Sequence, residues 1–185
     1  MPLFSIEHLP VQSGSADGYD AILLTSGNAV RAAADYLTGD HNLSVYAVGS
    51  ATASALHKLS VPVAKTGSEG VEALLRVAGA DGHKRLLWLA GEDYTAIPQL
   101  NGVSIDIEIV YRSAAVSTPD DFASKVTQSD LVILHSSRAA THFAGLCDAL
   151  ELHRGAITLA TFSTAIALSA GVGWASMIVA DTPND

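Results

Sequence analysis

Two kinds of segment alternate along most of this 185-residue chain. Short apolar runs, typical of buried strands, precede longer stretches in which apolar residues recur every three or four positions, typical of helices. This alternation predicts an α/β fold with parallel sheets covered by helices on both faces. The predicted strands are residues 3–11, 21–25, 45–48, 61–64, 85–90, 103–116, 131–135, 157–162 and 177–180. The predicted helices are 29–37, 51–59, 71–78, 94–100, a helix capped by Thr118 with Pro119 in its first position, 137–150 and 164–170.

The pattern returns about 110 residues after its start, as expected for an internal repeat. Residues 19–30 and 129–140 both contain an Asp, a short apolar strand, a Ser and then an Ala at matching positions. Thr52-Ala53 is echoed in the same order by Thr164-Ala165. The sequence therefore predicts two similar α/β units, the second of which begins at Thr118.

Composition and charge narrow the function classes. The chain is 49% hydrophobic and 16% charged, which supplies a core and excludes disorder. Its net charge of -9 argues against nucleic-acid and anionic-membrane partners, so an anionic ligand must be held locally. The single cysteine, Cys147, excludes an internal disulfide and is expected to pack in the core. Without a membrane-length apolar run or a signal peptide, a cytoplasmic location is expected.

Candidate binding residues cluster where predicted strands lead into helices. In parallel sheets these junctions meet at one edge, where the first N–H groups of the helices can hold a carboxylate or phosphate. The alternative is that Ser26, Ser137 and Ser163 only cap helices, at about 1 kcal/mol each. The four junctions contain Ser26, Gly27 and Asn28; Gly49, Ser50 and Thr52; Ser136 and Ser137; and Ser163 and Thr164.

Familiar catalytic motifs are missing from the sequence. The chain has no dinucleotide-binding glycine motif, phosphate loop or nucleophile elbow, and its histidines lack metal-site spacing, so no metal is predicted. His135 is expected to be a buried neutral imidazole, with a substrate contact as the alternative. Tyr111 could donate a proton to a leaving group, with Arg112 easing its deprotonation. A structural role is the commoner one for such a tyrosine.

Several segments, taken in order, resemble the uroporphyrinogen-III synthase family, and they extend over nearly the whole chain. The segments are LLTSGNAV, VYAVGSATASAL, TGSEGVEALL, RLLWLAGEDYT, IEIVYRSAAV and LVILHSSRAATHF. No single motif is decisive, whereas the ordered set is specific.

The resemblance implies two flavodoxin-like lobes with parallel sheets, residues 13–106 and 118–185, joined by extended connectors at 1–12 and 107–117. It implies a cofactor-free enzyme that closes hydroxymethylbilane into uroporphyrinogen III with inversion of the last pyrrole ring. In this interpretation Tyr111 helps the hydroxyl group depart. The junction residues, together with Gly91 of the Gly-Glu element, contact the substrate.

The sequence also departs from the family's pattern. Family members usually begin with a further strand and helix before the segment that matches residues 2–4. The second lobe is therefore expected to be incomplete and to self-associate through its uncovered parts. Two alternatives remain open, an inactive homologue and a small-anion-binding α/β module. A receiver-like signalling module is weaker, because that class needs acidic residues at the strand ends.

Overall fold

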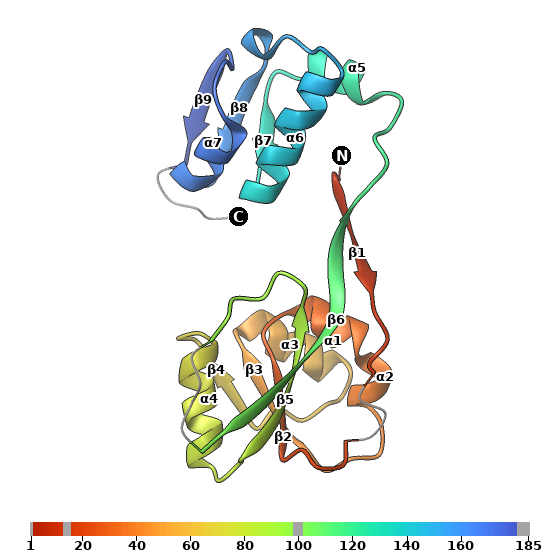
Figure 1. Ribbon diagram of the computed structural model, residues 1–185, viewed down its shortest axis with the longest axis vertical. Helices are drawn as coiled ribbons and strands as arrows, with labels where there is room; N and C mark the ends of the chain where they lie inside the picture. Colours follow the sequence, from red (N-terminus) through yellow and green to blue (C-terminus); the bar gives the residue numbers. More distant parts are fainter. Residues whose placement is uncertain (1, 13–15, 98–101, 181–185) are drawn as a thin grey trace. The chain divides into compact units, whose positions relative to one another are not determined.

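The computed structural model describes residues 2–12, 16–97 and 102–180. The chain forms two compact units (Figure 1). The large unit contains residues 6–114, and the small unit contains residues 1–5 together with 115–185. Within the described residues, no helix has the length and apolar character needed to cross a membrane.

The large unit is built around one mixed sheet with the strand order β1-β6-β5-β2-β3-β4. Strands β2 to β6 are parallel. Strand β1 runs antiparallel to β6, since Leu9 N–H donates to Val110 O and Val116 N–H donates to Leu3 O. The strands are β1 (Phe4–His8), β2 (Ala21–Leu24), β3 (Ser44–Val48), β4 (Lys65–Gly67), β5 (Arg85–Gly91) and β6 (Ser104–Ala115), and the helices are α1 (Gly27–Ala32), α2 (Ala34–Leu37), α3 (Ser50–Lys58) and α4 (Val71–Ala80).

Strand β2 is the centre of this sheet. Ile22 and Leu24 pack with residues of α1 and α3, whereas Ala21 and Leu23 pack with residues of α4 on the opposite face. All four side chains are 0% exposed. Because β2 lies between β3 and β5, the chain reverses its direction of winding beside β2, and the carboxyl ends of β2 and β5 flank this switch point.

Asp20 joins the amino ends of β2 and β5. Its carboxylate accepts hydrogen bonds from the main-chain N–H groups of Lys84, at 2.7 Å, and Arg85, at 2.9 Å. These two bonds hold the pKa of Asp20 below its usual value of 3.8. The ionised carboxylate therefore favours the folded state.

The small unit has a parallel sheet with the order β7-β8-β9. Its core joins Phe122, Phe143, Leu159 and Ile166 to Cys147, which is 0% exposed. Burial raises the pKa of the Cys147 thiol to about 11, and the expected packing role is confirmed. The elements are β7 (Val132–Leu134), β8 (Thr158–Thr161) and β9 (Ser176–Val179), with α5 (Phe122–Thr127), α6 (Ser137–Ala149), the 3-10 helix η1 (Arg154–Ala156) and α7 (Thr164–Ala170).

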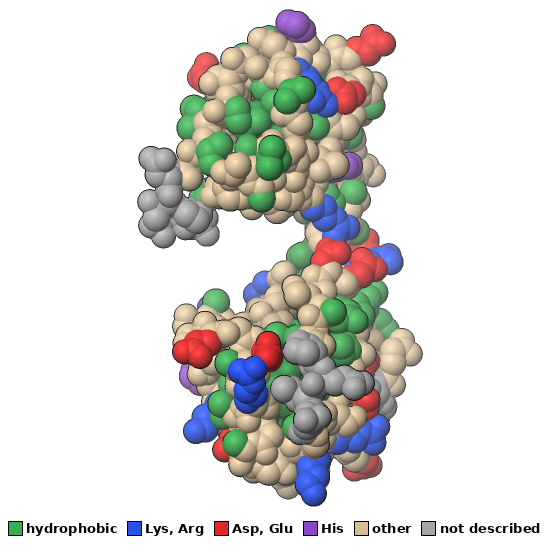
Figure 2. All heavy atoms as spheres, turned by 60° about the vertical axis from the view of Figure 1, so that its left-hand side comes forward, with side chains coloured by type: hydrophobic (Ala, Val, Ile, Leu, Met, Phe, Trp, Pro, Cys, Tyr) green, Lys and Arg blue, Asp and Glu red, His purple; other side chains and the backbone are tan. Residues whose placement is uncertain are grey.

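One face of the small sheet is uncovered within the described residues. Ile133, Ala160 and Ile178 lie side by side in register across it. Ile133 is 53% exposed and Ile178 is 51% exposed. Figure 2 shows several hydrophobic side chains on the visible surface of this unit. The prediction that helices cover both faces of each sheet is thus correct for the large unit and wrong for the described part of the small unit.

The predicted repeat is present as repeated topology. In the large unit β2, α1, β3, α3 and β4 follow one another, and in the small unit β7, α6, β8, α7 and β9 do the same. In each set the three strands are parallel neighbours in chain order.

Some predicted elements are wrong. Residues 61–64 form no strand, because Val61 N–H closes the end of α3 by donating to Leu56 O, and the third strand of the repeat is β4 instead. Residues 94–97 are not helical, and the remainder of that predicted helix, from residue 98, lies outside the described residues. The helix expected at Thr118 begins only at Phe122, after a turn in which Phe122 N–H donates to Pro119 O.

Candidate functional site

A cavity of about 490 Å³ lies at the carboxyl edge of the large sheet. Ser26 and Asn28 line it from the turn that follows β2, and Gly91 and Tyr111 line it from β5 and β6. Its position is the switch point beside β2, where open parallel sheets bind their ligands. The structure thus brings together four of the predicted site residues.

Tyr111 is held directly against Gly91. The two residues pair across β5 and β6 after a register shift, in which Ala90 pairs with Ile109 and Val110 is the extra residue. A Cβ atom placed on Gly91 would lie 2.4 Å from Cζ and 2.6 Å from the hydroxyl oxygen of Tyr111. The phenol ring therefore occupies the space that any other side chain at position 91 would need.

Arg112 is paired with Glu7 instead of being available to ease the deprotonation of Tyr111, the role that the sequence suggested. Its guanidinium Nε lies 2.7 Å from a carboxylate oxygen of Glu7, and this ion pair raises the pKa of Arg112. The charge of Arg112 is compensated by Glu7.

Four cavity residues were not singled out from the sequence. Glu92 and Asp93 follow Gly91 and bring two carboxylates to the cavity, and Trp88 and Tyr94 bring two aromatic rings. The rings meet edge to face, with their centroids 5.4 Å apart. Trp88 is 2% exposed, and its Nε1 atom is buried without a hydrogen-bond partner among the described residues. The run Gly-Glu-Asp-Tyr directly after an apolar strand was the available signal.

The turn between β2 and α1 has an ordered, capped conformation. Ser26 is the N-cap, and its hydroxyl oxygen accepts a hydrogen bond from Asn28 N–H at 3.1 Å. Capping uses one lone pair of the Ser26 hydroxyl oxygen and leaves its O–H available as a donor. Gly27 is the first helical residue of α1.

None of the three predicted residues in the turn between β3 and α3 lines the Tyr111 cavity, although Val48, the last residue of β3, does. Gly49 has a φ of 82° and donates its N–H to Gly67 O at 2.7 Å. Ser50 is exposed, and Thr52 is 3% exposed in the first turn of α3. A contact of Gly49, Ser50 or Thr52 with substrate stays a prediction.

The predicted residues of the small unit lie at the carboxyl edge of its sheet. Ser136 caps α6 by accepting from Ala139 N–H at 3.1 Å, so the cap expected at Ser137 is one residue earlier. Ser137 is helical, and its hydroxyl donates to Ala165 O at 3.5 Å. Ser163 caps α7, which begins at Thr164. These four residues therefore surround the starts of two adjacent helices.

His135 is exposed rather than buried, contrary to expectation. It follows the last residue of β7, and its ring stacks on that of Phe162, which follows β8, with centroids 4.6 Å apart. The expectation failed because β7 ends at Leu134, so His135 lies outside the strand and its buried positions.

Comparison with known proteins gives the family. The family model described as uroporphyrinogen-III synthase HemD matches residues 1–185. The chain belongs to this family. Comparison with curated proteins finds no sequence relative of the chain.

Solved synthase structures resemble this one in fold. The uroporphyrinogen-III synthetase of Helicobacter pylori 26695 is 18% identical, with a TM-score of 0.70, and the match covers 98% of this chain and 85% of the other. A mutant uroporphyrinogen III synthase of Thermus thermophilus is 17% identical, with a TM-score of 0.48, and its match covers 97% and 82%. The Helicobacter pylori comparison shows that the α/β architecture is shared.

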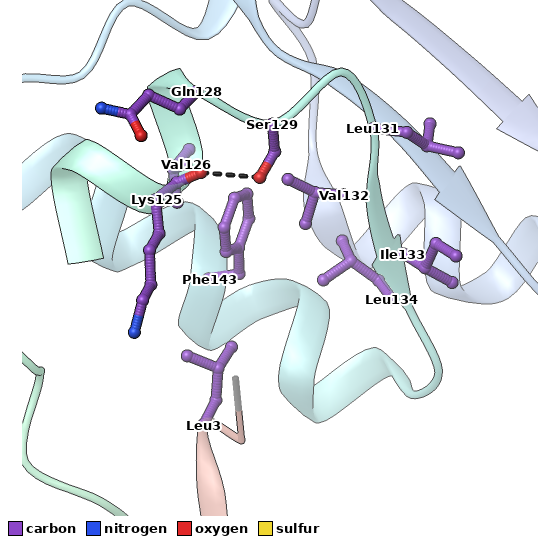
Figure 3. A pocket seen from close by; sticks show the side chains of 10 residues that line it. All are labelled: Leu3, Lys125, Val126, Gln128, Ser129, Leu131, Val132, Ile133, Leu134 and Phe143. Atoms are coloured by element: carbon purple, nitrogen blue, oxygen red, sulfur yellow. Dashed lines mark hydrogen bonds between the residues drawn. The ribbon is translucent and has the colours of Figure 1, made fainter. Parts of the chain in front are cut away.

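A different cavity, of about 480 Å³, lies in the small unit of this uroporphyrinogen-III synthase family member. Figure 3 shows that its side chains come mainly from the end of α5, from β7 and from the segment between them, with Phe143 from the middle of α6, and that they are mostly apolar. The one cation among its described lining residues, Lys125, is 2.7 Å from Asp121 in an ion pair. None of the predicted site residues lines it, so the cavity at Tyr111 is the better candidate for the chemistry. No cluster of metal-ligating side chains occurs among the residues that the structure describes.

Proposed function

We propose that this protein is an active uroporphyrinogen-III synthase, which closes hydroxymethylbilane into uroporphyrinogen III with inversion of the last ring and without a cofactor. Membership of the family supports this activity. The observation that carries the proposal is the position of Tyr111, whose phenol is packed on Gly91 in the cavity at the switch point of the large sheet.

The first step is loss of the substrate's terminal hydroxyl group. The Tyr111 hydroxyl donates its proton to the leaving oxygen while the carbon–oxygen bond breaks, so that water departs and an azafulvene cation remains. Glu92 and Asp93 line the same cavity, and their negative charges favour the cation over the neutral substrate. Both residues are exposed, so the contribution of their charges is screened by water.

The second step is bond formation within the chain of pyrroles. The substituted carbon of the last ring attacks the cationic carbon and forms a spiro intermediate. Reopening and reclosure invert the ring, and transfer of a ring proton back to the Tyr111 phenolate completes the product and restores the phenol. In this step the protein mainly restricts the conformation of a reactive chain and suppresses direct closure.

Substrate contacts are proposed at the helix starts of both units. In the large unit the donors are the Ser26 hydroxyl, the Asn28 side chain and, in the turn at Gly49 and Ser50, the N–H and hydroxyl groups of Ser50, since the Gly49 N–H already donates to Gly67 O. In the small unit the donors are Ser136, Ser137, Ser163 and Thr164. Hydroxyl groups and main-chain N–H groups suit a substrate with eight carboxylates, because they bind an anion without needing a cation at each position.

The experiment is an assay of product isomers. The protein is mixed with hydroxymethylbilane, and the oxidised type I and type III porphyrins are separated and quantified against a sample without protein. An active synthase diverts hydroxymethylbilane from the uncatalysed type I product to an excess of type III. A folded protein that gives only type I would overturn the proposal and favour the inactive homologue.

A further inference from the structure

A second groove adjoins the Tyr111 cavity, between helices α1 and α3. Its volume is about 430 Å³, and Ser26 and Asn28 line both it and the cavity that contains Tyr111. None of the ten described residues that line the groove is acidic, whereas two of them, Arg31 and Lys58, are cations. The geometry points to this groove as the binding site for a carboxylate side arm of the substrate, an inference that rests on the proposed function.

Arg31 is directed towards the start of its own helix. Its guanidinium donates to the side-chain oxygen of Asn28, one turn earlier in α1. Its Nη1 atom lies 3.6 Å from the point where a Cβ on Gly27 would be. The guanidinium therefore lies beside the β2–α1 turn, next to Asn28, which lines both the groove and the Tyr111 cavity.

Arg31 and Lys58 lack an acidic partner among the described residues, whereas five of the ten Lys and Arg residues of the chain have one. Arg76, Arg85, Arg112, Lys125 and Arg154 each form an ion pair with a carboxylate. Arg31 and Lys58 form no such pair within the described residues. In a protein with a net charge of -9, two uncompensated cations in one groove make it a local attraction for an anion.

The two adjoining hollows have opposite charge. The Tyr111 cavity contains Glu92 and Asp93, which repel a carboxylate and favour the cationic ring. The groove contains Arg31 and Lys58, which attract a carboxylate and repel the cationic ring. A pyrrole ring that reacts beside Tyr111 can therefore place an acetate or propionate arm past Ser26 and Asn28 into the groove. This arrangement fixes the orientation of the ring.

A purely structural interpretation of Arg31 is that its bond to Asn28 stabilises α1, as side chains three residues apart do in helices. That interpretation predicts a loss of thermal stability in Arg31→Gln and no effect of Lys58→Gln on ligand binding. The carboxylate site predicts the reverse: both variants melt near the wild-type temperature because both side chains are exposed, and both bind the ligand less well.

The test uses uroporphyrin III, the oxidised eight-carboxylate product, as the binding probe, and hydroxymethylbilane as the kinetic substrate. Arg31→Gln and Lys58→Gln should each raise the Kd of uroporphyrin III and the KM of hydroxymethylbilane about threefold to tenfold, with little change in kcat. Arg31→Lys should retain most of the affinity. The matched control is Arg76→Gln, which removes an equal charge from the exposed face of α4.

Salt provides a second readout. Added NaCl should weaken probe binding to the wild type more than to the variant that lacks both Arg31 and Lys58. Wild-type affinity and KM in that double variant, or an equal loss in Arg76→Gln, would overturn the site. A wild type that binds uroporphyrin III through these residues but forms no type III product would refute the proposed activity and leave the carboxylate site standing. Formation of type III product with an unchanged KM in the double variant would refute the carboxylate site and leave the proposed activity standing.

Discussion

Replacing Gly91 by alanine tests how the position of Tyr111 determines activity. The added methyl carbon would lie 2.4 Å from Cζ of the tyrosine, where carbon atoms in contact are normally about 3.5 Å apart. The ring must therefore move by about 1 Å. The three atoms nearest to the new methyl group all belong to Tyr111, so the tyrosine is the group that has to yield.

The expected effect is larger on turnover than on stability. Gly91 does not have a positive φ, so alanine fits its backbone, and the overlap should cost about 1–3 kcal/mol in the free energy of unfolding. A displacement of about 1 Å in a catalytic group can reduce turnover about 100-fold. We expect kcat for type III product to fall by about that factor in Gly91→Ala, with a folded protein by circular dichroism and a KM close to that of the wild type.

The decisive comparison is a double-mutant cycle. If Gly91 acts only by placing the Tyr111 hydroxyl, adding Gly91→Ala to Tyr111→Phe should cause no further loss of kcat. In a Tyr111→Ala background, Gly91→Ala should cause no loss of thermal stability, because the phenol ring that the new methyl group would overlap is absent. Equal losses in the wild-type and Tyr111→Phe backgrounds would refute this reasoning and would support a direct contact of Gly91 with substrate.

Three further outcomes are expected. Tyr111→Phe should lower kcat by about 100-fold or less without abolishing the formation of type III product, and either complete loss in a folded variant or no loss would count against its role as proton donor. Asp20→Asn should lower the melting temperature at pH 7. Because the folded-state pKa of Asp20 is below 3.8, the difference in melting temperature between wild type and variant should shrink as the pH falls below about 4. A difference that is independent of pH would contradict a stabilising role of the ionised carboxylate. The small unit should self-associate through the sheet face that contains Ile178, because strands β7 to β9 carry no charged residue. In light scattering, the Ile178→Lys oligomer should have a dissociation constant about tenfold higher than that of the control Val172→Lys. A wild-type protein that is a cooperatively folded monomer would reject this prediction.

Much of the fold could be predicted from the sequence because the central strands are continuous apolar runs. Strand β2 and strand β5 are buried on both faces, and helix α7 has the predicted bounds. The error at residues 61–64 has a physical cause. Val61 and Val63 are apolar because they pack at the end of α3 in the core of the large unit, a role that gives the same local pattern as a short strand.

The candidate site was less accessible to sequence reasoning. Tyr111 could be named, but its contact with Gly91 depends on the register of β5 against β6 and on the extra residue Val110, neither of which has a local signal. The charge of Arg112 was visible, whereas its pairing with Glu7 depends on a strand about 100 residues away in the chain. The acidic Tyr111 cavity and the basic groove between α1 and α3, which meet at Ser26, likewise depend on how the helices pack and have no local sequence signal.

The internal repeat includes the helix-capping serines but not the residues proposed for catalysis. Ser26 and Ser136 occupy equivalent positions, and each caps the helix that follows its strand, so the repeat gives both units the same kind of helix start. Gly91 and Tyr111, however, come from β5 and β6, which pair beyond β2 and have no counterpart beside β7 among the described residues. In the proposed mechanism, therefore, the proton donor Tyr111, the carboxylates of Glu92 and Asp93 and the switch point all belong to the large unit. It follows that substitutions at Ser136 or Ser163 should act on substrate affinity, whereas substitutions in β5 and β6 should act on the rate of ring closure.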